Sequence, residues 1–137
     1  MNEKQNAIEW LKASKDDLDA ITELLKNPSL TNVVAFHTQQ AIEKSFKAVL
    51  EFKRIGFVKT HNLERLYSKI EDVLFLGDLK ELELINEIYI DTRYPGDNGL
   101  LPSGKPTLEE AYEFNRFAWG VFDKVCTIVG VDKKEFE

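Results

Sequence analysis

The stretch at residues 35–50, AFHTQQAIEKSFKAVL, constrains the fold of this chain more than any other part of its sequence. Apolar or small residues recur in it every three or four positions, which is the spacing of one buried face of an α-helix. The centre of that face is small, because it is formed by Ala41, Ser45 and Ala48. We therefore expect a helix that another helix approaches closely.

A line of polar side chains runs beside this apolar face. His37, Gln40 and Lys44 are spaced i, i+3 and i+7, so they share one side of the expected helix. A helix used only for packing needs no such set. The line predicts either a binding site or a solvated surface.

Helical periodicity extends over most of the chain and predicts five helices, at residues 3–26, 29–54, 61–76, 78–93 and 107–129. The expected N-caps are Ser29, Thr60, Asp78 with Glu81, and Thr107 with Glu110. No segment alternates as a strand does, and the length of 137 residues suits one domain, 1–137. We predict an all-α fold, an up-and-down bundle of four to five helices.

Charge and cysteine content narrow the functional classes. The net charge of −6 argues against general coating of nucleic acid, although residues 41–70 are rich in Lys and Arg and residues 71–91 are rich in acids. This step in charge would either join two helices or present a basic surface to an anionic partner. The single cysteine, Cys126, excludes an internal disulfide. With no signal-like or membrane-length apolar run, we expect a cytoplasmic protein that does not enter a membrane.

Asp91, Arg93 and Tyr94 stand where the fourth helix meets a long loop at residues 95–106, which holds three of the four prolines. The Arg93 guanidinium is suited to a phosphate or carboxylate, and Asp91 would orient it. The alternative is an ion pair that fastens the loop. Combined with His37, Gln40 and Lys44, Arg93 would form a pocket for an anion such as a nucleotide phosphate.

The two histidines, His37 and His61, are expected to lie far apart. The helix after His37 continues for about 17 residues, or roughly 25 Å at 1.5 Å per residue, before the chain turns back. This argues against a shared metal site or a two-histidine acid–base pair, and a capping role suits His61 better than catalysis. The sequence also contains no Walker, GxGxxG or HExxH motif, so we expect no cofactor and no metal, and a nucleotide would be held by side chains.

Four blocks of the sequence together resemble the HEPN domain: FHTQQAIEKSFKAVL (36–50), KTHNLERL (59–66), YIDTRYPG (89–96) and PSGKPTLEEAYEF (102–114). They occur in the order and spacing of that family. The matching polar residues are His37, Gln40, Glu43, Lys44, His61, Asp91, Arg93 and Tyr94. The resemblance implies a small helical bundle that forms a homodimer, often encoded beside a minimal nucleotidyltransferase.

The resemblance also implies a function. We expect a protein that binds a nucleotide, a minimal nucleotidyltransferase partner or both, as the HEPN half of a toxin–antitoxin-like pair. The ligand-binding residues would be His37, Gln40, Lys44, Arg93 and Tyr94. The expected dimer buries parts of the second and fourth helices and brings the two Arg93 positions into one cleft.

An alternative is a metal-independent ribonuclease toxin that cleaves RNA in the cleft around Arg93, with Arg93 and Asp91 as catalytic residues. Ribonuclease members of the family carry a histidine shortly after the arginine. Asn98, Gly99 and Leu100 occupy those positions here, so His37 or Asp91 would have to replace it. A third possibility is that the polar line serves only dimer packing.

Overall fold

The computed structural model describes residues 2–93 and 105–136, and these residues form helices and connecting segments without a strand. The helices are α1 (Glu3–Leu24), α2 (Thr31–Phe52), α3 (Leu63–Ser68), α4 (Lys80–Arg93) and α5 (Leu108–Val129), with short 3-10 turns at Pro28–Leu30 and Lys133–Phe136. The prediction of an all-α bundle is confirmed. None of the helices in these ranges is long and apolar enough to cross a bilayer.

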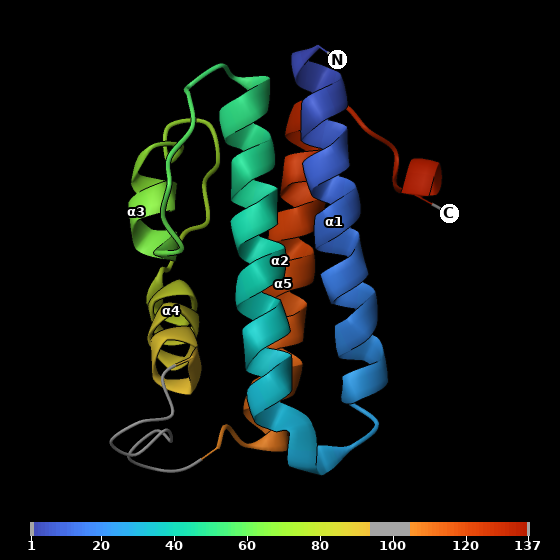
Figure 1. Ribbon diagram of the computed structural model, residues 1–137, viewed down its shortest axis with the longest axis vertical. Helices are drawn as coiled ribbons and strands as arrows, with labels where there is room; N and C mark the ends of the chain where they lie inside the picture. The colour runs from blue at the N-terminus through green and yellow to red at the C-terminus, as the bar shows by residue number, and fades with distance from the viewer. Residues whose placement is uncertain (1, 94–104, 137) are drawn as a thin grey trace.

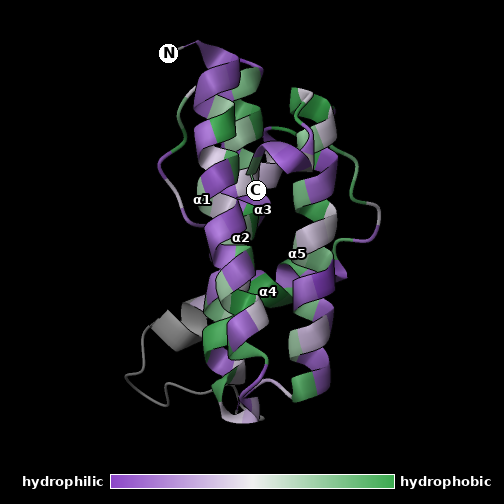
Figure 2. Cartoon of the chain, turned by 90° about the vertical axis from the view of Figure 1, so that its right-hand side faces the viewer, coloured by the Kyte–Doolittle hydropathy of each residue, from purple (hydrophilic) through white to green (hydrophobic). Residues whose placement is uncertain are grey.

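The helix α2 lies at the centre of the bundle (Figure 1). Helix α1 packs antiparallel along one side of it, α5 runs along its back, and α3 and α4 follow one another along the remaining side. Both hydrophobic and hydrophilic residues occur around each helix, as expected where one side packs inward and the other meets solvent (Figure 2). Because α2 contacts every other helix, its side chains decide how the elements are placed.

The contact between α1 and α2 is made by small residues, as the sequence predicts. The Ser14 hydroxyl of α1 donates to the Ala41 carbonyl at 2.8 Å and lies 2.9 Å from the Ser45 hydroxyl. Ser14, Ala41 and Ser45 are all buried. A side-chain hydroxyl of one helix reaches the backbone of the other only when the two helices are close, so these residues set the distance between α1 and α2.

The start of α2 differs from the sequence-based expectation. Ser29 is not the N-cap, because its backbone N–H and its hydroxyl both donate to the Asn27 side chain, at 3.0 and 2.7 Å. This closes a 3-10 turn over Pro28–Leu30, and α2 begins only at Thr31. The expected break at Asn27-Pro28 is correct, but the side chain of Asn27 caps the 3-10 turn, and the N-cap position of α2 is Leu30, which makes no side-chain cap hydrogen bond.

The third helix is much shorter than expected. It spans Leu63–Ser68, and its cap is the Asn62 side chain, which accepts from the Arg65 N–H, rather than Thr60. The Tyr67 hydroxyl then donates to the Leu74 carbonyl and accepts from the Leu76 N–H. These tertiary hydrogen bonds hold the segment after Ser68 in turns, so the helical periodicity of residues 69–76 does not become a helix.

The two predicted capping boxes have different outcomes. Thr107 and Glu110 form the expected reciprocal pair at the start of α5, with both hydrogen bonds present. At α4 the Asp78 side chain accepts from the Lys80 N–H, but Glu81 does not complete a box and turns toward α5 instead. The box predicted at α4 is therefore not formed: the Asp78 side chain turns the chain just ahead of the helix, whose first backbone hydrogen bond runs from the Glu83 N–H to the Leu79 carbonyl.

The small face of α2 gives a first prediction. Ala41→Leu should destabilise the protein by about 1–3 kcal/mol, because the added methylenes have no space beside Ser14. Chemical denaturation followed by circular dichroism measures this. Ala13→Leu is the matched control, since Ala13 lines an open surface hollow on α1, and equal losses in both variants would contradict the assignment.

Candidate functional site

A buried carboxylate, Asp17 of α1, holds two members of the polar line on α2. The His37 Nδ1 lies 2.8 Å from one Asp17 oxygen, and the Lys44 Nζ lies 2.7 Å from the other. The Asp17 side chain is only 10% exposed. A buried carboxylate needs such partners, because its removal from water is costly unless it is paired and hydrogen-bonded. His37 and Lys44 therefore clamp α1 to α2.

A second buried carboxylate, Glu43, repeats this arrangement on the next turns of α2. The His61 Nδ1 lies 2.9 Å from one of its oxygens, and the Lys47 Nζ lies 2.8 Å from the other. The Gln39 side chain also donates to Glu43, at 3.1 Å, and to the His61 carbonyl, at 2.8 Å. Glu43 thus fastens the segment before α3 to α2.

The pKa of the Glu43 carboxyl is lowered from its ordinary value. Burial by itself raises this pKa, but hydrogen bonds from Lys47, His61 and Gln39 together outweigh burial. Glu43 is therefore ionised when the protein is folded at neutral pH. An ionised carboxylate only accepts hydrogen bonds, so each of its partners must be a donor.

This requirement fixes the orientation of both imidazoles. His37 and His61 each place Nδ1 against a carboxylate, so Nδ1 carries a proton and donates. The other ring nitrogen, Nε2, is then free of that role and is an acceptor when the ring is neutral and a donor when it is charged. The side chains are 28% and 54% exposed, so both rings reach the surface.

Aromatic rings connect the two histidines. The Phe36 ring meets the His37 ring edge to face, with centroids 5.3 Å apart, and stacks on the Tyr89 ring of α4 at 5.8 Å. Tyr89 in turn lies 6.3 Å from the His61 ring. Tyr89 is buried, whereas Phe36 is 38% exposed. The exposed Phe36 ring therefore lies on the surface beside His37.

Five partly exposed residues share this side of α2, and we call them the α2 strip: Phe36, His37, Gln40, Lys44 and Lys47. His61 flanks the strip. The two lysines and the two histidines place four basic groups over the buried carboxylates, and the Lys47 ammonium also lies 5.3 Å from the centre of the Trp10 ring. The strip combines hydrogen-bond donors with one exposed aromatic ring.

The expected separation of the two histidines is wrong. The chain after α2 runs back along that helix before α3 begins, as Figure 1 shows, so His61 lies beside Glu43. Glu43 follows His37 by six residues, about 9 Å along a helix, not 25 Å. His61 is also not the cap of α3, since Asn62 has that role.

The predicted ligand-binding residues are brought together only in part. His37 and Lys44 share Asp17, whereas Gln40 donates to the Gln39 side chain at 2.7 Å. Asp91 and Arg93 are among the last residues of α4, but their side chains lie outside the described part of the structure. Tyr94 is also outside it. Arg93 follows Tyr89 by four residues, one helical turn beyond the ring that stacks on Phe36.

Two lysines of the basic run at residues 41–70 are paired with buried carboxylates. Lys44 pairs with Asp17 of α1, and Lys47 pairs with Glu43 four residues earlier in α2. Neither lysine is therefore paired with the acidic residues at 71–91. They are fixed by carboxylates that the sequence places within helices.

Sequence reasoning overlooked Asp17, Phe36 and Tyr89. For Asp17 a signal existed, because it falls between Ser14 and Ile21 on the buried face of α1, where an acid requires a partner. No comparable signal marked Phe36 or Tyr89, since aromatic residues are ordinary on a helix that packs. Their contact depends on how α4 lies against α2.

The structure therefore defines a class: an all-α bundle whose central helix carries a basic and aromatic strip above two buried carboxylates. Residues 7–128 match the HEPN domain, and the chain belongs to that family. No curated protein and no solved structure matched the chain. In the described ranges, no three His, Cys, Asp or Glu side chains are grouped as a metal site requires.

The lowered pKa of Glu43 gives a second prediction. A carboxyl with a depressed folded pKa contributes stability above its unfolded pKa, near 4.3, and this contribution is lost as pH falls through the folded value. Glu43→Gln should therefore lower the free energy of unfolding at pH 7 by about 1–3 kcal/mol. The deficit relative to wild type should shrink as the pH falls below about 4.3.

Urea denaturation at a series of pH values measures both effects. Glu64→Gln is the matched control, because Glu64 is an exposed glutamate of α3. A deficit in Glu43→Gln that stays constant from neutral to acid pH would show that the carboxylate charge is not responsible.

Proposed function

We propose that this HEPN protein binds a nucleotide, or a nucleotide within RNA, on the α2 strip. The observation that carries the proposal is the position of the Phe36 ring, which is exposed, stacked on Tyr89 and bordered by His37. Any nucleobase can stack on an exposed aromatic ring, because every nucleobase has a π-face. The ring is held in place by its two aromatic neighbours, so little ordering is needed on binding.

The charges beside Phe36 suit a phosphate. Lys44 and Lys47 donate to Asp17 and Glu43 while their side chains stay 26% and 14% exposed, and an ammonium has three donors. The remaining donors, and Nε2 of a charged His37, are available to phosphate oxygens. The buried carboxylates place these groups before a ligand arrives.

The strip also explains how a net charge of −6 is compatible with an anionic ligand. Affinity depends on the local field at the site, and a group of cations on one face attracts an anion to an acidic protein. The Arg93 position, one turn beyond Tyr89, would extend the site toward the end of α4.

The partners follow from family membership as part of this proposal. The HEPN protein would act as a homodimer, paired with a minimal nucleotidyltransferase in a toxin–antitoxin-like system. Co-purification of the two proteins when they are expressed together is the direct test of that pairing.

The stacking role of Phe36 gives a third prediction. Phe36→Ala should weaken nucleotide binding by roughly tenfold or more, because base–aromatic stacking contributes about 1–3 kcal/mol. Isothermal titration with each of the four ribonucleoside monophosphates measures this. Phe75→Ala is the control, since Phe75 is 78% exposed and lies beside α5. Wild-type protein that binds none of the four, and no short single-stranded RNA, would overturn the proposal.

A second candidate activity is metal-independent RNA cleavage, favoured by the position of Arg93 in α4, one helical turn beyond Tyr89. His37 or Asp91 would serve as the base in place of the family's motif histidine. Arg93→Ala should then abolish cleavage of single-stranded RNA in the presence of a chelator and relieve growth inhibition on expression. Intact RNA after incubation with the wild-type protein would exclude this activity.

A further inference from the structure

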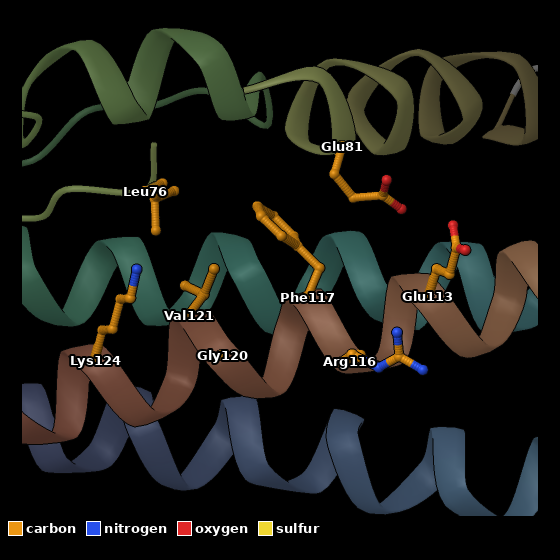
Figure 3. Close-up of a pocket in the computed structure, with 8 residues that line it drawn as sticks. All are labelled: Leu76, Glu81, Glu113, Arg116, Phe117, Gly120, Val121 and Lys124. Atoms are coloured by element: carbon orange, nitrogen blue, oxygen red, sulfur yellow. The ribbon is translucent and has the colours of Figure 1, made fainter. Parts of the chain in front are cut away.

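A groove between α4 and α5 lies outside the α2 strip and has no role in the proposed function. It has a volume of about 430 Å³, which is within the range of sites that hold small ligands. Figure 3 shows Glu81 reaching down from α4 and Glu113 reaching up from α5 toward the same space. The groove is lined by Leu76, Glu81, Glu113, Arg116, Phe117, Gly120, Val121 and Lys124.

Charges of both signs line the groove, and they are separated along its length. Glu81, Glu113 and Arg116 lie at one end, and Lys124 lies at the other (Figure 3). The Lys124 ammonium donates to the Phe75 carbonyl at 3.0 Å. Among the ion pairs between described residues, none includes Glu81, Glu113 or Arg116. Two acids and one base at the same end of the groove are therefore open to a ligand.

The Glu81 carboxyl needs a donor. One of its oxygens is buried, and no hydrogen bond from the described residues reaches it. Burial, followed by the charges of Glu113 and then Glu110, raises the pKa of Glu81. Arg116 is not among the causes of this shift, so its guanidinium does not compensate the Glu81 carboxyl. An ammonium group placed between Glu81 and Glu113 would supply both a donor and a positive charge.

Arg116 gives the same end of the groove a second means of recognition. It follows Glu113 by three residues, and in Figure 3 its guanidinium lies beside α5, whereas Glu81 belongs to the opposite wall. A guanidinium offers a planar fork of N–H donors that matches the two oxygens of a carboxylate. A ligand that contacts the acids and Arg116 together must therefore carry an ammonium and a carboxylate close to one another, as an α-amino acid does.

The middle of the groove is apolar and has free space. Val121 is buried, and Leu76 and Phe117 are partly buried at the edge of the core. A Cβ built at Gly120 would meet no atom within 4 Å, so nothing in the fold fills the groove at that position. An apolar side chain placed here would remove the remaining apolar surface from water, which favours binding.

We propose that this groove binds a free α-amino acid with a large apolar side chain. Its ammonium lies between Glu81 and Glu113, and its carboxylate lies on Arg116. Its side chain extends over Phe117 and Gly120 toward the middle of the groove. Each charged group of the ligand then meets the opposite charge, and the buried Glu81 oxygen gains a donor. The site does not depend on nucleotide binding at the α2 strip.

Three ligands with the same aromatic ring test this assignment: L-phenylalanine, phenethylamine, which lacks the carboxylate, and phenylpropionate, which lacks the ammonium. NMR titration of the isotope-labelled full chain measures their dissociation constants and follows the Gly120 amide. L-Phenylalanine should shift that amide and bind about tenfold or more tightly than either analogue, because each analogue loses charge-assisted hydrogen bonds. Wild-type protein that shows no saturable binding of L-phenylalanine, or that binds both analogues equally tightly, overturns the proposal.

Two substitutions assign the two ends of the ligand. Arg116→Ala should weaken binding of L-phenylalanine by about tenfold and leave phenethylamine unchanged, because only L-phenylalanine has a carboxylate. Glu81→Gln should weaken both amines to a similar degree and should not weaken phenylpropionate. Arg65→Ala and Glu109→Gln are the matched controls, since both residues are exposed and neither lines the groove. Equal losses for L-phenylalanine and phenethylamine in Arg116→Ala would contradict the carboxylate contact and overturn the proposal.

A third substitution separates binding from folding. Gly120→Leu places a side chain in the apolar part of the groove, where nothing in the fold lies within reach of its Cβ. Leucine also favours a helix more than glycine does, so the variant should unfold at the denaturant concentration of wild type or a higher one. It should still abolish binding of L-phenylalanine. Undiminished binding in this folded variant would show that the ligand lies elsewhere, which overturns the proposal.

Discussion

The bundle depends on two buried carboxylates that are each shared by one histidine and one lysine. Asp17 joins α1 to α2 through His37 and Lys44, and Glu43 joins the segment before α3 to α2 through His61. Apolar packing alone leaves helices free to slide by a turn at modest cost. A buried charge with fixed partners does not, since a shifted register would leave it unpaired. These contacts therefore fix the register of α1, and of the segment before α3, against α2.

The same contacts prepare the surface above them. A lysine or histidine that must satisfy a buried acid loses much of its rotational freedom, so its remaining donors point outward in one arrangement. The Phe36 ring is similarly held, between His37 and Tyr89. The residues that stabilise the fold are thus also the residues that would bind a ligand. For this reason the spacing of the polar line on α2 could not show which of the two roles it has.

The fold class was predictable because helical periodicity is local and long, as in α2 and α5. The helix boundaries were less predictable where a side-chain hydrogen bond decided them. The Tyr67 hydroxyl holds the residues after α3 in turns, and the Asn27 side chain closes the 3-10 turn that delays the start of α2. Of the site, His37 and Lys44 were identified from their spacing. Their common partner Asp17 belongs to another helix, and the position of His61 depends on the path of a connecting segment, so neither follows from the spacing within one helix.

The placement of α3 and α4 has a consequence for how the protein opens. Both helices rest mainly on α2, with only slight contact between α4 and α5, whereas α1, α2 and α5 pack on one another. The amides of α3 and α4 can then exchange with solvent by a local opening that leaves the other three helices intact. Such an opening would separate Tyr89 from Phe36, so it would remove the support of the exposed ring before the bundle itself unfolds.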